Sequence, residues 1–280
     1  MTNSFLNRLW NLSPRTIVTA IARRVSGQSK PQWHTIQHGA LKGVQLFLDP
    51  YVYDGWREMI EGKFDSFLYE ALSEVGDLTG LTIWDIGAHF GYHSLAFSAL
   101  VGEKGLVAAF EPNQYNISRF KKHMEKNSAI AKRILLVPCA LSDEDGQSTF
   151  VISNDVDGSA SSGSHISGAL PPLEGGSYEA FQRQTVPTMK IDTLLETGRQ
   201  KTPDVVKIDV EGAELLVLRG GARLFSQKKP FILMEVHNIV MMFYVQKTLT
   251  EFGYEMKILN EQESTLSRCF IFAKPLSAAF

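Results

Sequence analysis

The sequence has little cysteine and no long apolar run, and both absences limit the kind of protein it encodes. Its 280 residues include 2 cysteines, Cys139 and Cys269, in segments that we predict to be the third and seventh strands of one sheet. Because those strands lie far apart in the expected sheet order, we predict neither a disulfide nor a cysteine-based metal site. No apolar stretch is long enough to cross a bilayer, and residues 1–27 lack the apolar core of a signal peptide. We therefore predict a cytoplasmic protein with reduced thiols.

An excess of basic charge is also absent. The formal net charge is -2 at pH 7 and the pI is near 6.4. No global positive field would attract nucleic acid, so we expect no nucleic-acid partner. With 44% hydrophobic residues and no internal repeat, the chain suits one large α/β domain with an additional N-terminal element.

The chain has a glycine turn but lacks two sequence signatures of phosphate binding. Residues 81–91, LTIWDIGAHFG, pass from an apolar run into glycines and then into an amphipathic segment, a pattern typical of strand, tight turn and helix. The dinucleotide fingerprint G-x-G-x-x-G needs one glycine more than this turn has, and no G-x-x-x-x-G-K-[ST] loop occurs. A bound cofactor could lie against the backbone of Gly87 and Gly91, facing the N-terminus of the following helix.

An acidic residue ends the next predicted strand, 106–110. Glu111 stands about 20 residues beyond the glycine turn, where a doubly wound sheet places the acid that binds ribose hydroxyls. A ribose-binding acid without a phosphate cradle favours a nucleoside ligand that carries no phosphate. S-adenosylmethionine fits that description.

Five segments then resemble those of the FkbM-type S-adenosylmethionine-dependent methyltransferases, in the family's order. They are WDIGAHFGYHSL, AFEPN, CALSDEDG, VVKIDVEGAELLVLRGG and MEVHN, and the resemblance runs from about Leu41 to the C-terminus. It implies a Rossmann-like class I methyltransferase fold, which is an α/β fold with a mostly parallel seven-stranded sheet and helices on both faces. It also implies S-adenosylmethionine as cofactor, S-adenosylhomocysteine as product and, usually, a hydroxyl oxygen as acceptor. His89 stands where the family commonly has asparagine, at the cofactor's methionine end.

The resemblance also implies a set of cofactor contacts. It places the adenine beside the end of the third strand, where residues 142–146 could alternatively form an ordinary turn. The expected contacts are Asp85, Gly87, Ala88, His89, Gly91, Tyr92, Glu111, Pro112, Asn113, Ala140, Leu141, Ser142 and Asp209.

Ionisable residues follow the fourth and fifth predicted strands, and we expect the chemistry there. Asp209 and Glu211 follow one strand and His237 the other, so they point toward one cleft at the carboxyl edge of the sheet. Alternatively, the two acids serve a helix N-terminus. An aliphatic hydroxyl is a weak acid, and a base adds about 10² to 10⁴ in rate. We predict His237 as that base, with Glu211 or Asp209 orienting it or the substrate, and Asn238 as a substrate contact.

A metal-assisted route is the alternative at the same strand ends. Asp209, Glu235 or His237 could hold a divalent ion that lowers the pKa of the hydroxyl. Oxygen ligands are plentiful, but nothing in the spacing demands a metal. We therefore favour acid/base chemistry and predict no metal.

Residues 1–65 are predicted to be an N-terminal extension and cover, and residues 66–280 the methyltransferase domain. Within the extension, residues 1–27 combine basic and aromatic residues. They predict a helix packed on the domain or on a second subunit, or one that contacts a membrane surface. A hairpin with its turn near 39–43 and a helical stretch follow.

Segments on both sides of the glycine turn could bind the acceptor. The resemblance includes a G-x-aromatic-acid motif at Gly62, Phe64 and Asp65, where the alternative is a core phenylalanine and a helix cap. The Gly/Ser-rich residues 154–184 are predicted to be a lid or substrate loop. The substrate candidates are Phe64, Asp65, Ser161, Ser162 and Asn238.

Other elements are expected around the site. We predict helices over 92–100 and 113–127, a strand over 134–141, and a helix capped by Asp192. Residues 241–244, MMFY, could line a pocket or lie in the core.

Together these observations predict an O-methyltransferase that acts on a hydroxyl of a small molecule, sugar or lipid-linked glycan. A nicotinamide-dependent oxidoreductase and a non-catalytic nucleoside-binding module are the alternatives. The first is opposed by the missing glycine.

Overall fold

The computed structural model describes residues 30–50, 54–152, 164–166, 169, 182–259 and 268–276. The chain divides into two units, one of residues 1–66 with 154–161 and one of residues 67–153 with 162–280. The predicted N-terminal helix lies outside the described residues. So does most of the predicted substrate loop, including Ser161 and Ser162.

The first unit contains a hairpin and a short helix. Strands β1 (Gln32–Thr35) and β2 (Gln45–Leu48) pair antiparallel, and helix α3 (Asp54–Glu61) follows. Gly39 and Gly43 have φ of +73° and +88°, values that glycine adopts without steric cost. The predicted hairpin, its turn and the helical stretch after it are therefore confirmed.

A seven-stranded sheet forms the centre of the second unit, in the order β12-β13-β11-β10-β3-β4-β5. The strands run parallel except for β13, which is antiparallel to both of its neighbours. This confirms the predicted mostly parallel sheet. The bounds are β3 (Thr82–Ile86), β4 (Leu106–Phe110), β5 (Ile134–Val137), β10 (Val205–Ile208), β11 (Phe231–Val236), β12 (Tyr254–Leu259) and β13 (Cys269–Pro275).

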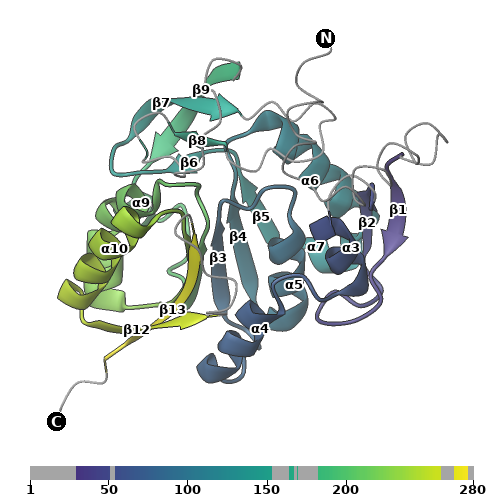
Figure 1. Ribbon diagram of the computed structural model, residues 1–280, viewed down its shortest axis with the longest axis horizontal. Coiled ribbons are helices and arrows are strands. Elements are labelled where there is room, and N and C mark those ends of the chain that lie inside the picture. The colour runs from purple at the N-terminus through teal and green to yellow at the C-terminus, as the bar shows by residue number, and fades with distance from the viewer. Residues whose placement is uncertain are drawn as a thin grey trace, which may run out of the picture. The chain divides into compact units, whose positions relative to one another are not determined.

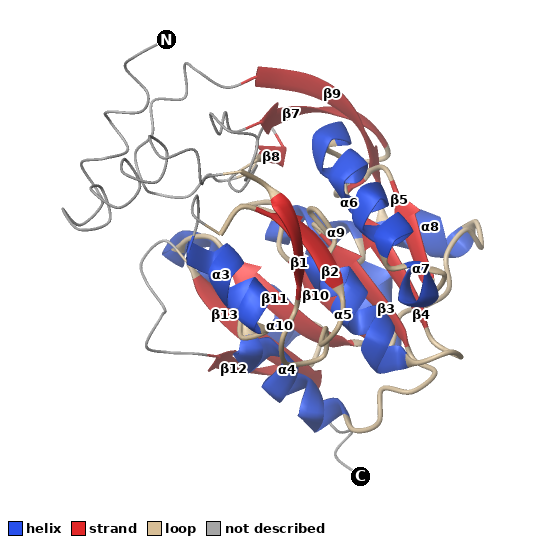
Figure 2. Ribbon diagram, turned by 90° about the vertical axis from the view of Figure 1, so that its right-hand side faces the viewer, coloured by secondary structure: helices blue, strands red, loops and turns tan. Residues whose placement is uncertain are grey.

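Helices cover both faces of this sheet (Figures 1 and 2). In Figure 1, α9 and α10 lie on one side of β3 and β4, and α5 and α7 lie on the other. The bounds are α4 (Ser66–Leu72), the 3₁₀ turn η1 (Ser73–Val75), α5 (Tyr92–Val101), α6 (Gln114–Lys126), α7 (Ser128–Ala131), α8 (Ile191–Glu196), α9 (Glu214–Gly220), the π-helical turn η3 (Leu224–Lys228) and α10 (Ile239–Glu251).

Alternation along β3 explains why the central strand needs both layers. Trp84 and Ile86 belong to the core formed with α8, α9 and α10, whereas Asp85 points the other way and accepts a hydrogen bond from Ser94 of α5. Successive side chains of a strand point to opposite faces, so β3 is buried on both. None of the described helices is long and apolar enough to span a bilayer.

A second sheet of four strands corrects one prediction. The expected strand over 134–141 is interrupted after Val137, because Pro138 has no N–H to continue the ladder and Ala140 instead pairs with Thr188. The second sheet has the order β6-β9-β7-β8, with β6 (Ala140–Leu141), β7 (Gly146–Ile152), β8 (His165–Ile166) and β9 (Gln182–Met189). Cys139 therefore lies between strands rather than within one, and both cysteines are free.

The predicted capping role of Asp192 is also wrong. Helix α8 begins after Lys190, and the carboxylate of Asp145 accepts hydrogen bonds there from the Lys190 N–H (2.8 Å) and the Thr193 hydroxyl (2.7 Å). The carboxylate of Asp192 accepts from the N–H groups of Arg223 and Leu224 instead. It therefore caps η3 rather than its own helix.

Candidate active site

The glycine turn after β3 is shaped by contacts within the protein. Gly87 and Gly91 have φ of +82° and +91°. A Cβ on Gly87 would lie 1.8 Å from the carbonyl oxygen of Asp209, and one on Gly91 would lie 2.2 Å from the ring of Phe120. Glycine at these two positions thus lets the turn approach the end of β10 and helix α6. Close packing within the protein is therefore a reason for the two glycines, whether or not a ligand binds.

Glu111, at the end of β4, is hydrogen-bonded to the same turn. Its Oε2 accepts a hydrogen bond from the His89 N–H (2.8 Å), and its Oε1 accepts from the Asn113 N–H (2.9 Å) and from Asn116 Nδ2 (3.2 Å). Burial raises the pKa of this carboxyl to about 7, although the three hydrogen bonds favour the ionised form. Because each carboxylate oxygen has two lone pairs, Oε2 can still accept from a ligand hydroxyl.

Two buried polar atoms near Glu111, His89 Nε2 and Asn113 Nδ2, have no hydrogen-bond partner among the residues that the structure describes. Burial, with a smaller effect of Arg119, lowers the pKa of His89 to about 3, so its ring is neutral. Unpaired buried polar groups are rare in native proteins and call for a partner. A nucleoside ligand, with ribose hydroxyls for Glu111 and polar groups for these two atoms, fits this set.

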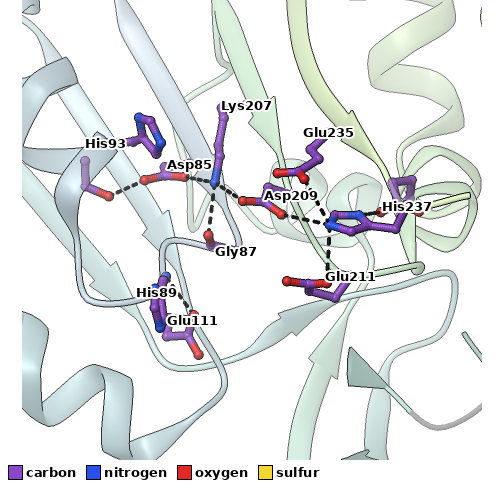
Figure 3. Close-up of polar contacts among 12 residues, drawn as sticks. Asp85, Gly87, His89, His93, Glu111, Lys207, Asp209, Glu211, Glu235 and His237 are labelled. Carbon is purple, nitrogen blue, oxygen red and sulfur yellow. Dashed lines mark hydrogen bonds and ion pairs between the residues drawn. The ribbon is translucent and has the colours of Figure 1, made fainter. Parts of the chain in front are cut away.

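Lys207, in the middle of β10, connects the turn to the next strand end (Figure 3). Its buried Nζ donates to the carbonyl oxygen of Gly87 (3.1 Å) and lies 3.3 Å from a carboxylate oxygen of both Asp85 and Asp209. Burial alone would lower the pKa of Lys207, but the two carboxylates raise it above its ordinary value. Lys207 was not among the predicted site residues, although a lysine within the otherwise apolar run VVKI was the available signal.

Four carboxylates surround the imidazole of His237, which follows β11. Nδ1 lies 2.7 Å from Glu214 Oε1, while Nε2 lies 3.3 Å from Glu211 Oε2 and 3.6 Å from oxygens of Asp209 and Glu235. The structure therefore brings together the three residues predicted at these strand ends, and Figure 3 shows them converging on the ring. Because an ionised carboxylate only accepts, the contact with Glu214 places a proton on Nδ1.

Glu214 was missed by the sequence analysis, which stopped at Glu211. It is fully buried in the first turn of α9, where its Oε1 also accepts from the Gly212 N–H (3.0 Å). Asp209 and Glu211 precede that helix, so the first-turn position proposed for them belongs to Glu214.

Carboxylates outnumber cationic groups in the cluster. Burial raises the pKa of Glu235 to about 8, and the neighbouring charge of Asp209 adds to the effect. Burial would lower the pKa of His237, but the carboxylates of Glu211 and Glu214 raise it well above its ordinary value. Both shifts favour the protonated forms, which offset part of the negative charge of the four carboxylates.

Several other candidates have structural contacts. Asn238 caps α10, since its Oδ1 accepts from the Met241 N–H (2.6 Å), and Leu141 lies in the core. The Ser142 hydroxyl donates to Asp143 (3.3 Å). The remaining cofactor candidates Ala88, Tyr92, Pro112 and Ala140 are buried.

Two further groups of predicted residues are described by the structure. Phe64 and Asp65 belong to the first unit, where Asp65 has a φ of +49°. Of residues 241–244, Met241 is buried, but Phe243 and Tyr244 are 65% and 46% exposed. The latter two are therefore not in the core.

A protein-family model and a characterised protein both match part of this chain. A model described as the methyltransferase FkbM domain matches residues 85–256. The hexuronic acid methyltransferase AglP of Haloferax volcanii is 31% identical over 183 residues, which are 65% of this chain and 67% of that protein.

Two solved structures are also similar. The methyltransferase FkbM of Methylobacillus flagellatus KT has 17% identity and a TM-score of 0.49, covering 69% of this chain and 43% of the other. The chain thus spans less than half of that structure's length. Fibrillarin of Aeropyrum pernix, in complex with natively bound S-adenosyl-L-methionine, has 14% identity and a TM-score of 0.44 over 74% of each chain.

Proposed function

The chain belongs to the FkbM methyltransferase family, and we propose that it transfers a methyl group from S-adenosylmethionine to a hydroxyl oxygen of a sugar or sugar acid. Membership rests on the family model over residues 85–256 and makes the chain an S-adenosylmethionine-dependent methyltransferase. The acceptor class is suggested by the relative that is named for hexuronic acid. One observation carries the proposal: buried Lys207 contacts both the glycine turn at Gly87 and Asp209 of the His237 cluster.

The cofactor half of the site consists of the glycine turn and the end of β4. Glu111 would accept hydrogen bonds from the ribose hydroxyls, as acids at this position do in doubly wound sheets. When bound, S-adenosylmethionine would supply a methyl group on a positively charged sulfur: the acceptor oxygen would form a bond to the methyl carbon as the sulfur–methyl bond breaks and S-adenosylhomocysteine leaves. The anionic cluster beyond Lys207 suits a positively charged sulfur nearby.

The acceptor half consists of Asp209, Glu211 and His237. In the neutral form of the His237 ring, Nδ1–H is donated to Glu214 and the lone pair of Nε2 lies beside Asp209 and Glu211, where it can take the proton of an acceptor hydroxyl. Glu214, rather than Glu211 or Asp209, orients the ring. Proton transfer of this kind contributes about 10² to 10⁴ in rate, and holding the acceptor in line contributes further.

Ligand binding tests the cofactor half first. We would measure thermal unfolding of the full chain with S-adenosylhomocysteine, S-adenosylmethionine, NAD or no ligand. A ligand at 100 times its Kd stabilises by about 2.7 kcal/mol, so we expect a clear rise in Tm with the two adenosyl ligands. Glu111→Ala should abolish the rise, whereas Glu103→Ala, at an exposed acid, should keep it.

Turnover tests the acceptor half. We would incubate the protein with methyl-labelled S-adenosylmethionine and glucuronic acid, galacturonic acid or a neutral hexose. Label on the sugar supports the proposal. Adenosyl binding without transfer to any of these acceptors would favour the non-catalytic alternative, and a Tm shift with NAD alone would favour the oxidoreductase.

A further inference from the structure

The Nε2 atom of His237 lies among carboxylates. Nδ1–H is donated to Glu214, and Nε2 lies 3.3 to 3.6 Å from oxygens of Glu211, Asp209 and Glu235. Carboxylates gathered in this way repel one another unless a positive charge lies among them, which is either a proton on Nε2 or a bound cation.

Three of these side chains have the geometry of metal ligands. One carboxylate oxygen each of Asp209 and Glu211 and one ring nitrogen of His237 lie within 4.8 Å of one another. Oxygen and nitrogen ligands bind divalent ions at about 2.0 to 2.2 Å, so ligand atoms around one ion are separated by about 3 to 4.4 Å. Small rotations of the two half-exposed carboxylates would bring these atoms onto a common centre.

The contacts of His237 are also typical of a histidine that binds a metal ion. Its side chain is 6% exposed, and its Nδ1 binds the fully buried carboxylate of Glu214 at 2.7 Å. Histidines that bind metals commonly donate their other ring N–H to such a carboxylate, which fixes the tautomer and the ring orientation. The ring is therefore already held with Nε2 toward the two carboxylates.

We infer that Asp209, Glu211 and His237 bind a divalent cation that in turn binds the acceptor hydroxyl. Two carboxylates with one imidazole suit Mn²⁺, since oxygen ligands favour Mg²⁺, Ca²⁺ and Mn²⁺ whereas imidazole favours the transition metals. Three protein ligands leave coordination positions for water and for acceptor oxygens.

This inference rests on the proposed function and refines one step of it. The cation would lower the pKa of the bound hydroxyl, so that its proton could pass to water instead of to Nε2 while the oxygen forms a bond to the methyl carbon and S-adenosylhomocysteine leaves. His237 becomes a ligand, and Glu214 becomes the residue that positions it. The proposed cofactor contacts at Glu111 and Gly87 are unchanged.

Mn²⁺ binding tests the inference without any turnover. We would treat the full chain with a chelator, saturate it with S-adenosylhomocysteine and titrate Mn²⁺, following the free ion by electron paramagnetic resonance. We expect one ion per chain. Asp209→Asn and Glu211→Gln should each weaken binding at least tenfold, and Glu214→Gln by about 10- to 100-fold. Glu251→Gln, the same change at an exposed acid of α10, should bind like the unmodified chain.

The outcomes separate this inference from the proposed function. If the free-ion signal is undiminished at millimolar Mn²⁺, or if Glu211→Gln binds as tightly as the unmodified chain, the cation site is wrong and His237 carries a proton instead. S-adenosylhomocysteine binding in the presence of chelator is the control for folding of every variant. If that binding is absent from the unmodified chain, the proposed function itself fails.

Discussion

Buried Lys207 and partly exposed Asp209 form an ion pair at the end of β10, with Nζ 3.3 Å from Oδ2. The same Nζ donates to the carbonyl oxygen of Gly87 and contacts Asp85. One side chain thus links the turn that we assign to the cofactor with the cluster that we assign to the acceptor. Because the lysine is buried, removing its charge would leave the Gly87 carbonyl and the carboxylates of Asp85 and Asp209 without the positive group that stabilises them.

Replacing this lysine should destabilise the protein and weaken cofactor binding together. Lys207→Met leaves two carboxylates beside an apolar side chain, and breaking a buried pair in this way costs about 3 to 5 kcal/mol. Urea unfolding measures the loss, and calorimetry measures the affinity for S-adenosylhomocysteine. Lys121→Met, on the exposed side of α6, is the control. A loss of less than about 1 kcal/mol at Lys207 would mean that the pair does not hold the turn.

Affinity for S-adenosylhomocysteine should depend on pH through Glu111. Burial raises the pKa of this carboxyl to about 7, and ribose hydroxyls donate to the ionised form. Below that pKa the ionised fraction falls about tenfold per pH unit, so the affinity should fall with it and should level off above about pH 8. Calorimetric titrations from pH 5.5 to 8.5 measure the profile.

The matched variant for this profile is Glu111→Gln, which cannot ionise. It should bind more weakly than the unmodified chain at pH 8, and its affinity should not change over the same range. An unmodified chain with a flat profile would show that Glu111 does not meet the ligand in its ionised form.

Gly87→Ala should lower the free energy of unfolding by more than the strain of a positive φ alone. The new Cβ would lie 1.8 Å from the Asp209 carbonyl oxygen, whereas a Cβ on Gly198, which also has a positive φ of +64°, meets nothing within 4 Å. Gly198→Ala should therefore cost about 1 kcal/mol, the penalty of the left-handed conformation. We expect Gly87→Ala to cost at least twice that and to abolish the Tm shift with S-adenosylhomocysteine. Equal costs at the two positions would contradict the close approach.

The central sheet could be predicted because a local sequence pattern marks its strands. The runs at 82–86 and 205–208 are apolar and are buried on both faces, and glycine or proline marks the ends of several of them. Asp209, Glu211 and His237 could be placed at one edge because the carboxyl ends of parallel strands meet there.

The second sheet could not be predicted in the same way. Strands β6 and β8 have two residues each, too few for any periodicity, and β6 pairs with β9 more than forty residues later. The roles of Lys207 and Glu214 depend likewise on contacts between distant elements. A lysine in a strand and a glutamate in a helix have no local pattern that reveals such partners.

Removing the support of His237 should lower turnover more than binding. Glu214→Gln keeps the size of the side chain and an amide oxygen that can accept from Nδ1–H, but it removes the negative charge, so the ring is held by a weaker hydrogen bond. We expect kcat to fall by about 10- to 100-fold while the affinity for S-adenosylhomocysteine changes little. Equal losses of both would indicate a general defect in folding.

Methyl transfer to a sugar oxygen tests the central claim most directly. Methyl-labelled S-adenosylmethionine would be incubated with glucuronic acid and the unmodified chain, Glu111→Ala or His237→Gln, and the product would be analysed by mass spectrometry before and after alkaline treatment. The account predicts an alkali-stable methyl ether that the unmodified chain forms and that both variants form at least 100-fold more slowly. Label on a nitrogen or carbon atom, an alkali-labile ester, or an undiminished rate in His237→Gln would contradict it.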